Sequence, residues 1–139
     1  MVRRAYHDLD INCAKTTLKV LSDLFECPLD PQVFLSATAM HGAGRSGGQC
    51  GLVEGALMFM GIYFGEKGVS DDNVSGIAKR LAGEFKASFG SISCSDLRPG
   101  GFQKDDPPHK CEGLTVKSIV LCHSFIKKAG RENLRNLHG

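Results

Sequence analysis

The six cysteines are the side chains of this chain best suited to chemistry, because a thiolate can bind a soft metal or exchange with a disulfide. They are Cys13, Cys27, Cys50, Cys94, Cys111 and Cys122. No two of them are spaced as C-x-x-C, so the sequence lacks the signature of a thioredoxin-type redox site and of a paired-knuckle zinc site. The C-x-x-C-H motif of covalent haem attachment is absent as well.

Four of the six cysteines fall at predicted helix starts or in glycine-rich loops, where cysteines that only fill a core have no reason to collect. These four are Cys13, Cys50, Cys94 and Cys111. The dipole and the free amides of a helix N-terminus stabilise a thiolate, so we expect lowered thiol pKa values at these positions. We expect Cys122, on an apolar helix face, to lie in the helix packing, whereas the role of Cys27 stays open.

The sequence around these four cysteines carries a further pattern, in segments 12–14, 47–57, 89–94 and 110–111. As a set, the segments resemble the C-GCAxxG-C-C family, which is named for a suspected redox activity. The resemblance covers about residues 10–125, and residues 50–55 fill the central motif, with Leu52 where Ala is more usual. Related domains occur in split-Soret-type cytochromes, so the resemblance implies an iron–sulfur or other iron site at the four cysteines. The cytochrome function itself does not carry over, because the haem-attachment motif is missing.

The preferred interpretation is a small redox-active, metal-binding protein in which Cys13, Cys50, Cys94 and Cys111 converge on an iron–sulfur cluster for electron transfer. One alternative is a metal-free protein in which two of these thiols cycle between dithiol and disulfide. Another is a structural zinc domain that binds a partner. We expect a redox partner protein. The sequence leaves open whether the protein is an enzyme or an electron carrier, and whether a homodimer shares the cluster.

A glycine-rich loop leads into Cys50, with five glycines among residues 41–51. This density excludes a regular helix and requires sharp turns or a close backbone approach. We expect the loop to wrap a cofactor, with Gly48, Gly51 and Gly55 forming the cofactor-binding backbone. A nucleotide site is disfavoured, because no strand precedes the Gly-x-Gly and no Gly-Lys-[Ser/Thr] follows it.

Four other polar side chains lie where they could serve such a site, and the sequence leaves most of their roles open. His41 precedes the glycine loop, and His109 stands two residues before the last of the four cysteines. Glu54 is alone in an apolar segment, so we expect it either to be buried and protonated or to border a polar pocket. His123 fits a helix surface.

The chain as a whole has the size and composition of one globular domain of 139 residues, with 42% apolar residues and a net charge of +2. These values argue against disorder, and the charge is too small to indicate a nucleic-acid surface. No apolar run reaches the roughly 20 residues of a membrane span. No apolar segment of a secretory signal follows the first arginines, so we expect a reducing, cytoplasmic location.

Helical spacing of apolar residues predicts an all-α bundle of four to five helices with two Gly/Pro-rich loops. The expected helices are 10–26 with Asp10 as cap, a shorter one from Pro31, 52–64, 70–89 between Ser70 and Gly90, one turn at 93–97, and 111–129. Gly130 is expected to end the last helix, leaving 131–139 as a frayed tail. The pairs Gly51 and Gly55, and Gly61 and Gly65, are each spaced to allow close packing of a neighbouring helix.

Overall fold

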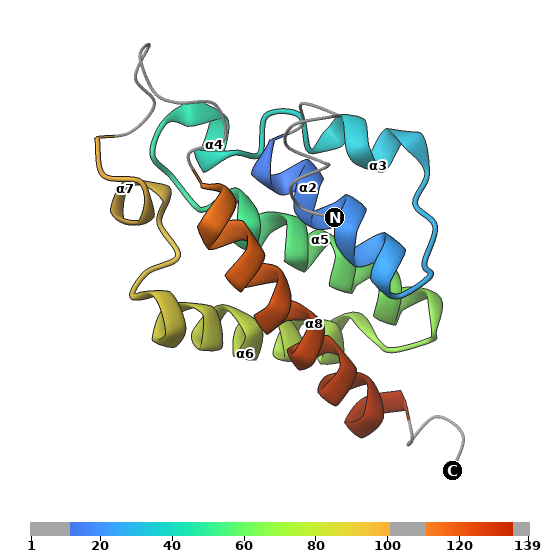
Figure 1. Ribbon diagram of the computed structural model, residues 1–139. Coiled ribbons are helices and arrows are strands. Elements are labelled where there is room, and N and C mark those ends of the chain that lie inside the picture. The colour runs from blue at the N-terminus through green and yellow to red at the C-terminus, as the bar shows by residue number, and fades with distance from the viewer. Residues whose placement is uncertain (1–11, 101–110, 135–139) are drawn as a thin grey trace.

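Seven α-helices make up most of the part of the chain that the structure, a computed structural model, describes: residues 12–100 and 111–134 (Figure 1). They are α2 (Cys13–Leu24), α3 (Pro31–Ser36), α4 (Gly42–Arg45), α5 (Gly51–Glu66), α6 (Asp71–Phe89), α7 (Cys94–Leu97) and α8 (Glu112–Leu134). These residues contain no β-strand, only an isolated bridge between Gln49 and Ser93. The predicted all-α fold is confirmed, and α2, α5, α6 and α8 are its long helices.

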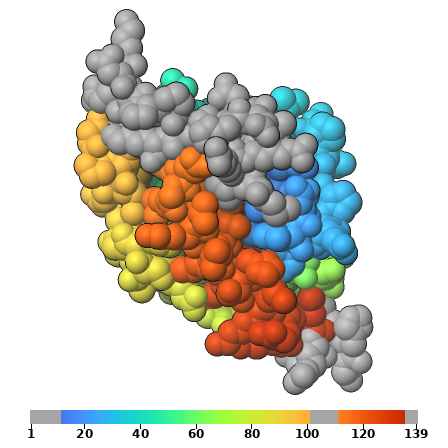
Figure 2. Space-filling model, in the orientation of Figure 1, coloured from blue at the N-terminus to red at the C-terminus, as the bar shows by residue number. Residues whose placement is uncertain are grey.

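The central helix is α5, whose sequence is apolar on nearly every face. Its fully buried large side chains are Leu52, Phe59, Met60 and Phe64. Helices α2 and α6 pack against α5, and α8 contacts α2, α5 and α6. In the space-filling view, α8 crosses the visible face between α6 on one side and α2 on the other (Figure 2). Each long helix therefore buries its apolar side against the others, with α5 in the middle.

The position of α5 in this core explains why its side chains are apolar. The helix has 16 residues, fewer than the roughly 20 that a membrane-spanning helix needs. Across residues 12–100 and 111–134, no helix combines the length and the hydropathy that crossing a membrane requires.

Helices α2 and α5 approach each other closely at Gly55. A Cβ built on Gly55 would lie 2.6 Å from the carbonyl oxygen of Ala14 and 3.1 Å from the Cβ of Thr17. Only a residue without a side chain lets the two backbones meet in this way. The other predicted pair, Gly61 and Gly65, is exposed with nothing within 4 Å of either. The prediction of close packing is wrong there, because that face of α5 points to solvent.

Most helix boundaries follow local signals in the sequence. The side chain of Asn12 accepts the amide of Lys15 at 2.9 Å and so caps α2. The predicted cap, Asp10, lies outside the described residues. Ser70 caps α6 through its hydroxyl, and Gly90 ends that helix in the left-handed conformation with φ of 89°, as predicted.

The last helix is longer than the sequence predicts, since α8 continues through Gly130 to Leu134. Gly130 is buried together with Ile126 and Ala129. Packing of this stretch outweighs the cost of about 1 kcal/mol that a glycine brings to a helix interior. The prediction that Gly130 ends the helix is therefore wrong, and the first residues of the predicted tail, 131–139, are helical. The rest of that tail lies outside the described part of the chain.

Alanine at Gly55 should destabilise the protein, whereas alanine at Gly61 in the same helix should stabilise it. The new Cβ of Gly55→Ala meets the α2 backbone at 2.6 Å, which should cost about 1–3 kcal/mol. The new Cβ of Gly61→Ala meets nothing within 4 Å, so the higher helix propensity of alanine should add up to about 1 kcal/mol. Urea unfolding of both variants checks this pair, and equal midpoints would contradict the close contact of α2 with α5.

Candidate functional site

The four cysteines singled out by the sequence stand at four helix starts that the structure brings together. Cys13 is the first residue of α2, Cys50 is the N-cap of α5, and Cys94 is the first residue of α7. Cys111 directly precedes α8, and its carbonyl oxygen accepts the amide of Thr115 at 2.8 Å. The four thiols lie close enough for each to act electrostatically on the other three. We call this group the cysteine cluster; a single chain supplies all of it.

A short backbone pairing holds Cys50 beside Cys94. The amide of Cys50 donates to the carbonyl of Ile92 at 2.8 Å, and the amide of Cys94 donates to the carbonyl of Gly48 at 2.7 Å. An antiparallel bridge joins the residues in between. Two loops that are far apart in the sequence are thereby fixed to each other, and each carries one cysteine of the cluster.

The sulfur of Cys13 reaches the cluster because Gly51 has no side chain. A Cβ on Gly51 would lie 2.5 Å from the Sγ of Cys13 and 2.9 Å from the carbonyl oxygen of Met40. The Nδ2 of Asn12 donates to the carbonyl of Thr38 at 2.8 Å, which ties the start of α2 to the segment before the glycine loop. Gly51 thus serves the cluster directly, whereas the contacts of Gly55 are with the α2 backbone and with Thr17.

Arg98 contacts the fourth cysteine of the cluster and was missed in the sequence. It is the C-cap of α7, and its Nη1 donates to the Sγ of Cys111 at 3.9 Å. The signal that could have found it is its spacing, because Arg98 follows Cys94 by four residues, about one helical turn.

Three of the cluster thiols, Cys13, Cys50 and Cys94, hold their protons more tightly than an exposed thiol does, because their pKa values are raised. Burial, and then the charges of Cys50, Cys111 and Cys94, raise the pKa of Cys13 from 9.0 to about 12. Burial raises the pKa of Cys50 to about 11, although two amides in the first turn of α5 oppose this. Burial and Cys111 also raise the pKa of Cys94. The expectation of lowered pKa values is wrong for these three thiols, because burial and mutual repulsion outweigh the amide hydrogen bonds.

The cluster is not a preformed site for a single metal ion. A tetrahedral zinc site needs its sulfurs about 2.3 Å from one ion. Within residues 12–100 and 111–134, no group of three or more His, Cys, Asp and Glu side chains is placed to hold such an ion. All six cysteines are free thiols. The four sulfurs are therefore neighbours that interact through their charge without closing around one point.

The remaining two cysteines lie away from the cluster. Cys122 is 1% exposed and belongs to the main hydrophobic core, as predicted. Burial raises its pKa to about 12. Cys27 is half-buried beyond the C-terminal end of α2, and its Sγ lies 4.0 Å from a carboxylate oxygen of Glu66.

The other polar candidates that the structure describes include Glu54 and His123. Glu54 is half-buried in the first turn of α5, so it is not the fully buried carboxyl that one expectation described. His123 is half-buried with its ring 5.2 Å from that of Phe25, a packing contact. His109, two residues before Cys111, lies outside the described residues.

The glycine loop contains a turn of the opposite hand, α4, in which all four residues have positive φ. Ala43 and Arg45 carry a Cβ, with φ of 50° and 65°, so each costs about 1–2 kcal/mol in this conformation. The predicted absence of a regular helix is confirmed. A Cβ on Gly48 would lie 2.6 Å from the Cβ of Ala43. The strained turn therefore packs directly on Gly48, whose carbonyl oxygen also accepts the amide of Cys94.

His41 joins this turn to the cluster. Its Nε2 accepts a hydrogen bond from the Nε of Arg45 at 2.9 Å. Its Cα would lie 3.2 Å from a Cβ on Gly51. Burial, and then the charges of Arg45 and Arg98, lower the pKa of His41. His41 therefore lies near enough to Arg45 and Arg98 for both charges to favour its neutral form.

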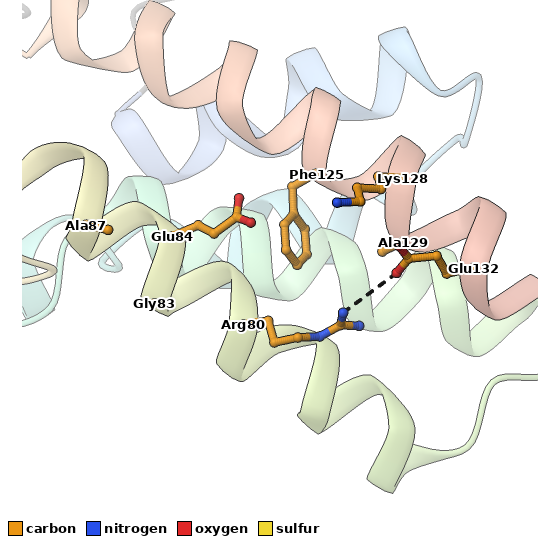
Figure 3. Close-up of a pocket in the computed structure, with 8 residues that line it drawn as sticks. All are labelled: Arg80, Gly83, Glu84, Ala87, Phe125, Lys128, Ala129 and Glu132. Carbon is orange, nitrogen blue, oxygen red and sulfur yellow. Dashed lines mark ion pairs between the residues drawn. The ribbon is translucent and has the colours of Figure 1, made fainter.

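A groove of about 340 Å³ lies between α6 and α8, away from the cysteines. Its rim carries Arg80, Glu84, Lys128 and Glu132, and Phe125 points between the helices (Figure 3). Arg80 and Glu132 form an exposed ion pair of 3.7 Å across it. None of the four cluster cysteines lines this groove, so the groove and the cysteine cluster are separate sites.

Comparison with known families agrees with the resemblance seen in the sequence. The sequence model of a family described as "Putative redox-active protein (C_GCAxxG_C_C)" matches residues 11–129. This range contains all four cysteines of the cluster and the glycine loop. No curated protein and no solved structure matches the chain.

The buried thiol of Cys122 should make the stability of the reduced, metal-free protein depend on pH. Its pKa is about 12 in the folded state against 9.0 ordinarily, so the unfolded chain loses this proton first. The contribution of this thiol to the free energy of unfolding is complete below pH 9.0. It is lost as the pH rises towards 12, by roughly 1 kcal/mol per pH unit. Urea unfolding of Cys122→Ala should show a weaker pH dependence than wild type, with Val120→Ala as control. Parallel curves would contradict the assignment.

Valine at Gly48 should disturb the cysteine cluster more than the helices. The added side chain meets the Cβ of Ala43 and displaces the loop whose carbonyl accepts the amide of Cys94. Far-UV circular dichroism should stay near wild type, while the rate at which Cys94 is alkylated should change severalfold. Unchanged alkylation would show that the loop does not shape the cluster.

Proposed function

The chain belongs to the C_GCAxxG_C_C family, and on that premise we propose that its cysteine cluster is a redox centre that binds an iron–sulfur cluster. The observation that carries the proposal is the convergence of Cys13, Cys50, Cys94 and Cys111, from four separate segments, at helix starts. When bound, the iron–sulfur group would accept and release one electron at a time.

The donor set of the chain fits such a group. Four thiols are the ligands that iron–sulfur clusters use most, and they are shared among two or four irons, so their sulfurs need not meet around one point. This requirement agrees better with the observed arrangement than the single-ion geometry of zinc does. The missing side chain of Gly51 leaves the Sγ of Cys13 in place beside Cys50.

The chain itself supplies charge compensation and shielding around the four sulfurs. The backbone amides of Ala14, Leu52 and Val53 donate to cluster thiols and so stabilise the thiolates that bind metal. The high pKa values of Cys13 and Cys50 mean that these thiols are protonated in the metal-free protein. Metal binding would release their protons and relieve the repulsion among the thiolates.

A second candidate is thiol chemistry without metal. The observation that favours it is that the thiols repel one another as thiolates and that none is paired. Two of them would give two electrons to a disulfide substrate and form an S–S bond. The two thiol protons would pass to the two thiols released from that substrate.

Alanine variants of the cysteines should separate ligand cysteines from packing cysteines. In protein purified without oxygen, iron and acid-labile sulfide per chain should fall severalfold for alanine at Cys13, Cys50, Cys94 or Cys111. Cys122→Ala is the matched control, because it removes a buried thiol outside the cluster at a cost of about 1 kcal/mol, and it should retain wild-type iron.

The outcomes of this experiment divide the candidates. Iron and sulfide in wild type, lost in the four variants, support the iron–sulfur proposal. A colourless wild type that forms a reversible disulfide between two of the four cysteines overturns it in favour of the second candidate. Equal losses for Cys122→Ala and Cys50→Ala would show that the ligand assignment is wrong.

A further inference from the structure

Arg98 links two cysteines of the cluster through one residue. Its amide donates to the carbonyl of Cys94 at 2.7 Å, which closes the single turn of α7. Its side chain extends to the start of α8, where Nη1 donates to the Sγ of Cys111 at 3.9 Å. The backbone of Arg98 therefore orders one cysteine while its guanidinium contacts the sulfur of another.

The charge of Arg98 acts on two cysteines of the cluster, Cys111 and Cys94. Cys111 and Arg98 are half-buried, whereas Cys94 is 7% exposed and Cys50 5% exposed. Besides contacting Cys111, the guanidinium opposes the rise in the pKa of Cys94 that burial and Cys111 cause. A guanidinium keeps its charge at every relevant pH, so this effect is permanent.

We propose that Arg98 is a positioning residue that sets the reduction potential of the centre by donating to the sulfur of Cys111. The inference rests on the proposed redox function of the cluster. A fixed positive charge beside a sulfur stabilises the reduced state, because that state carries more negative charge. An iron–sulfur group gains this charge directly on reduction, so Arg98 raises its potential. The same sign holds for a dithiol only at pH values where one of its thiols is deprotonated, because a protonated dithiol carries no more charge than the disulfide.

The test compares Arg98→Ala, Arg98→Gln and Arg98→Lys with wild type in an anaerobic redox titration. Losing the charge should favour oxidation about tenfold, which corresponds to a potential lower by about 59 mV for a one-electron centre, or by about 30 mV for a dithiol titrated above the pKa of its thiols. Arg98→Ala and Arg98→Gln should both show this shift, whereas Arg98→Lys should keep most of the wild-type potential. Arg80→Ala, at the exposed ion pair of the α6–α8 groove (Figure 3), is the remote control and should show no shift.

The titration separates the inference from the proposed function. The titration of wild type alone tests the proposed function. If wild type has neither an iron–sulfur spectrum nor a reversible disulfide within the cluster, both the proposed redox centre and the role of Arg98 are overturned. If wild type titrates and Arg98→Gln does so at the same potential, only the inference is overturned. If Arg98→Ala loses the centre by misfolding, the comparison of Arg98→Gln with Arg98→Lys still decides, because they differ in charge.

Discussion

The rest of the structure depends on the close contact between α2 and α5. The contact exists because Gly51 and Gly55, one turn apart, present no side chain to α2: the sulfur of Cys13 lies against the first and the carbonyl of Ala14 against the second. With the helices at this distance, the first residue of α2 lies beside the N-cap of α5. Cys13 and Cys50 therefore meet where the two helices pack, and both lie against the hydrophobic core around α5.

The other half of the cluster is brought in by polar contacts. Backbone hydrogen bonds fix the loop before α5 to the segment before α7, and the guanidinium of Arg98 joins α7 to the start of α8. The cluster thus has one pair of cysteines, Cys13 and Cys50, held by helix packing, and a second pair, Cys94 and Cys111, held by a loop and one arginine.

Charge explains why this arrangement suits redox chemistry. Several thiols buried together are unfavourable as thiolates, and the raised pKa values of Cys13, Cys50 and Cys94 express that cost. In the metal-free protein the thiols avoid this repulsion by keeping their protons. A bound cation or an S–S bond would avoid it once the protons are released. The helix N-termini and Arg98 supply positive potential from one side, but too little to overcome burial.

The sequence by itself determined the helices, most of their ends and the four cysteines that belong together, because apolar spacing, caps and glycine positions act over a few residues. It did not determine what each glycine faces: Gly55 meets a backbone, Gly61 meets solvent, and Gly130 is buried inside a helix that local rules would end. It also predicted the wrong direction for the pKa values of Cys13, Cys50 and Cys94, and it did not indicate the contact of Arg98 with Cys111. Burial and contacts between distant segments decide these properties, and they exist only once the helices have packed.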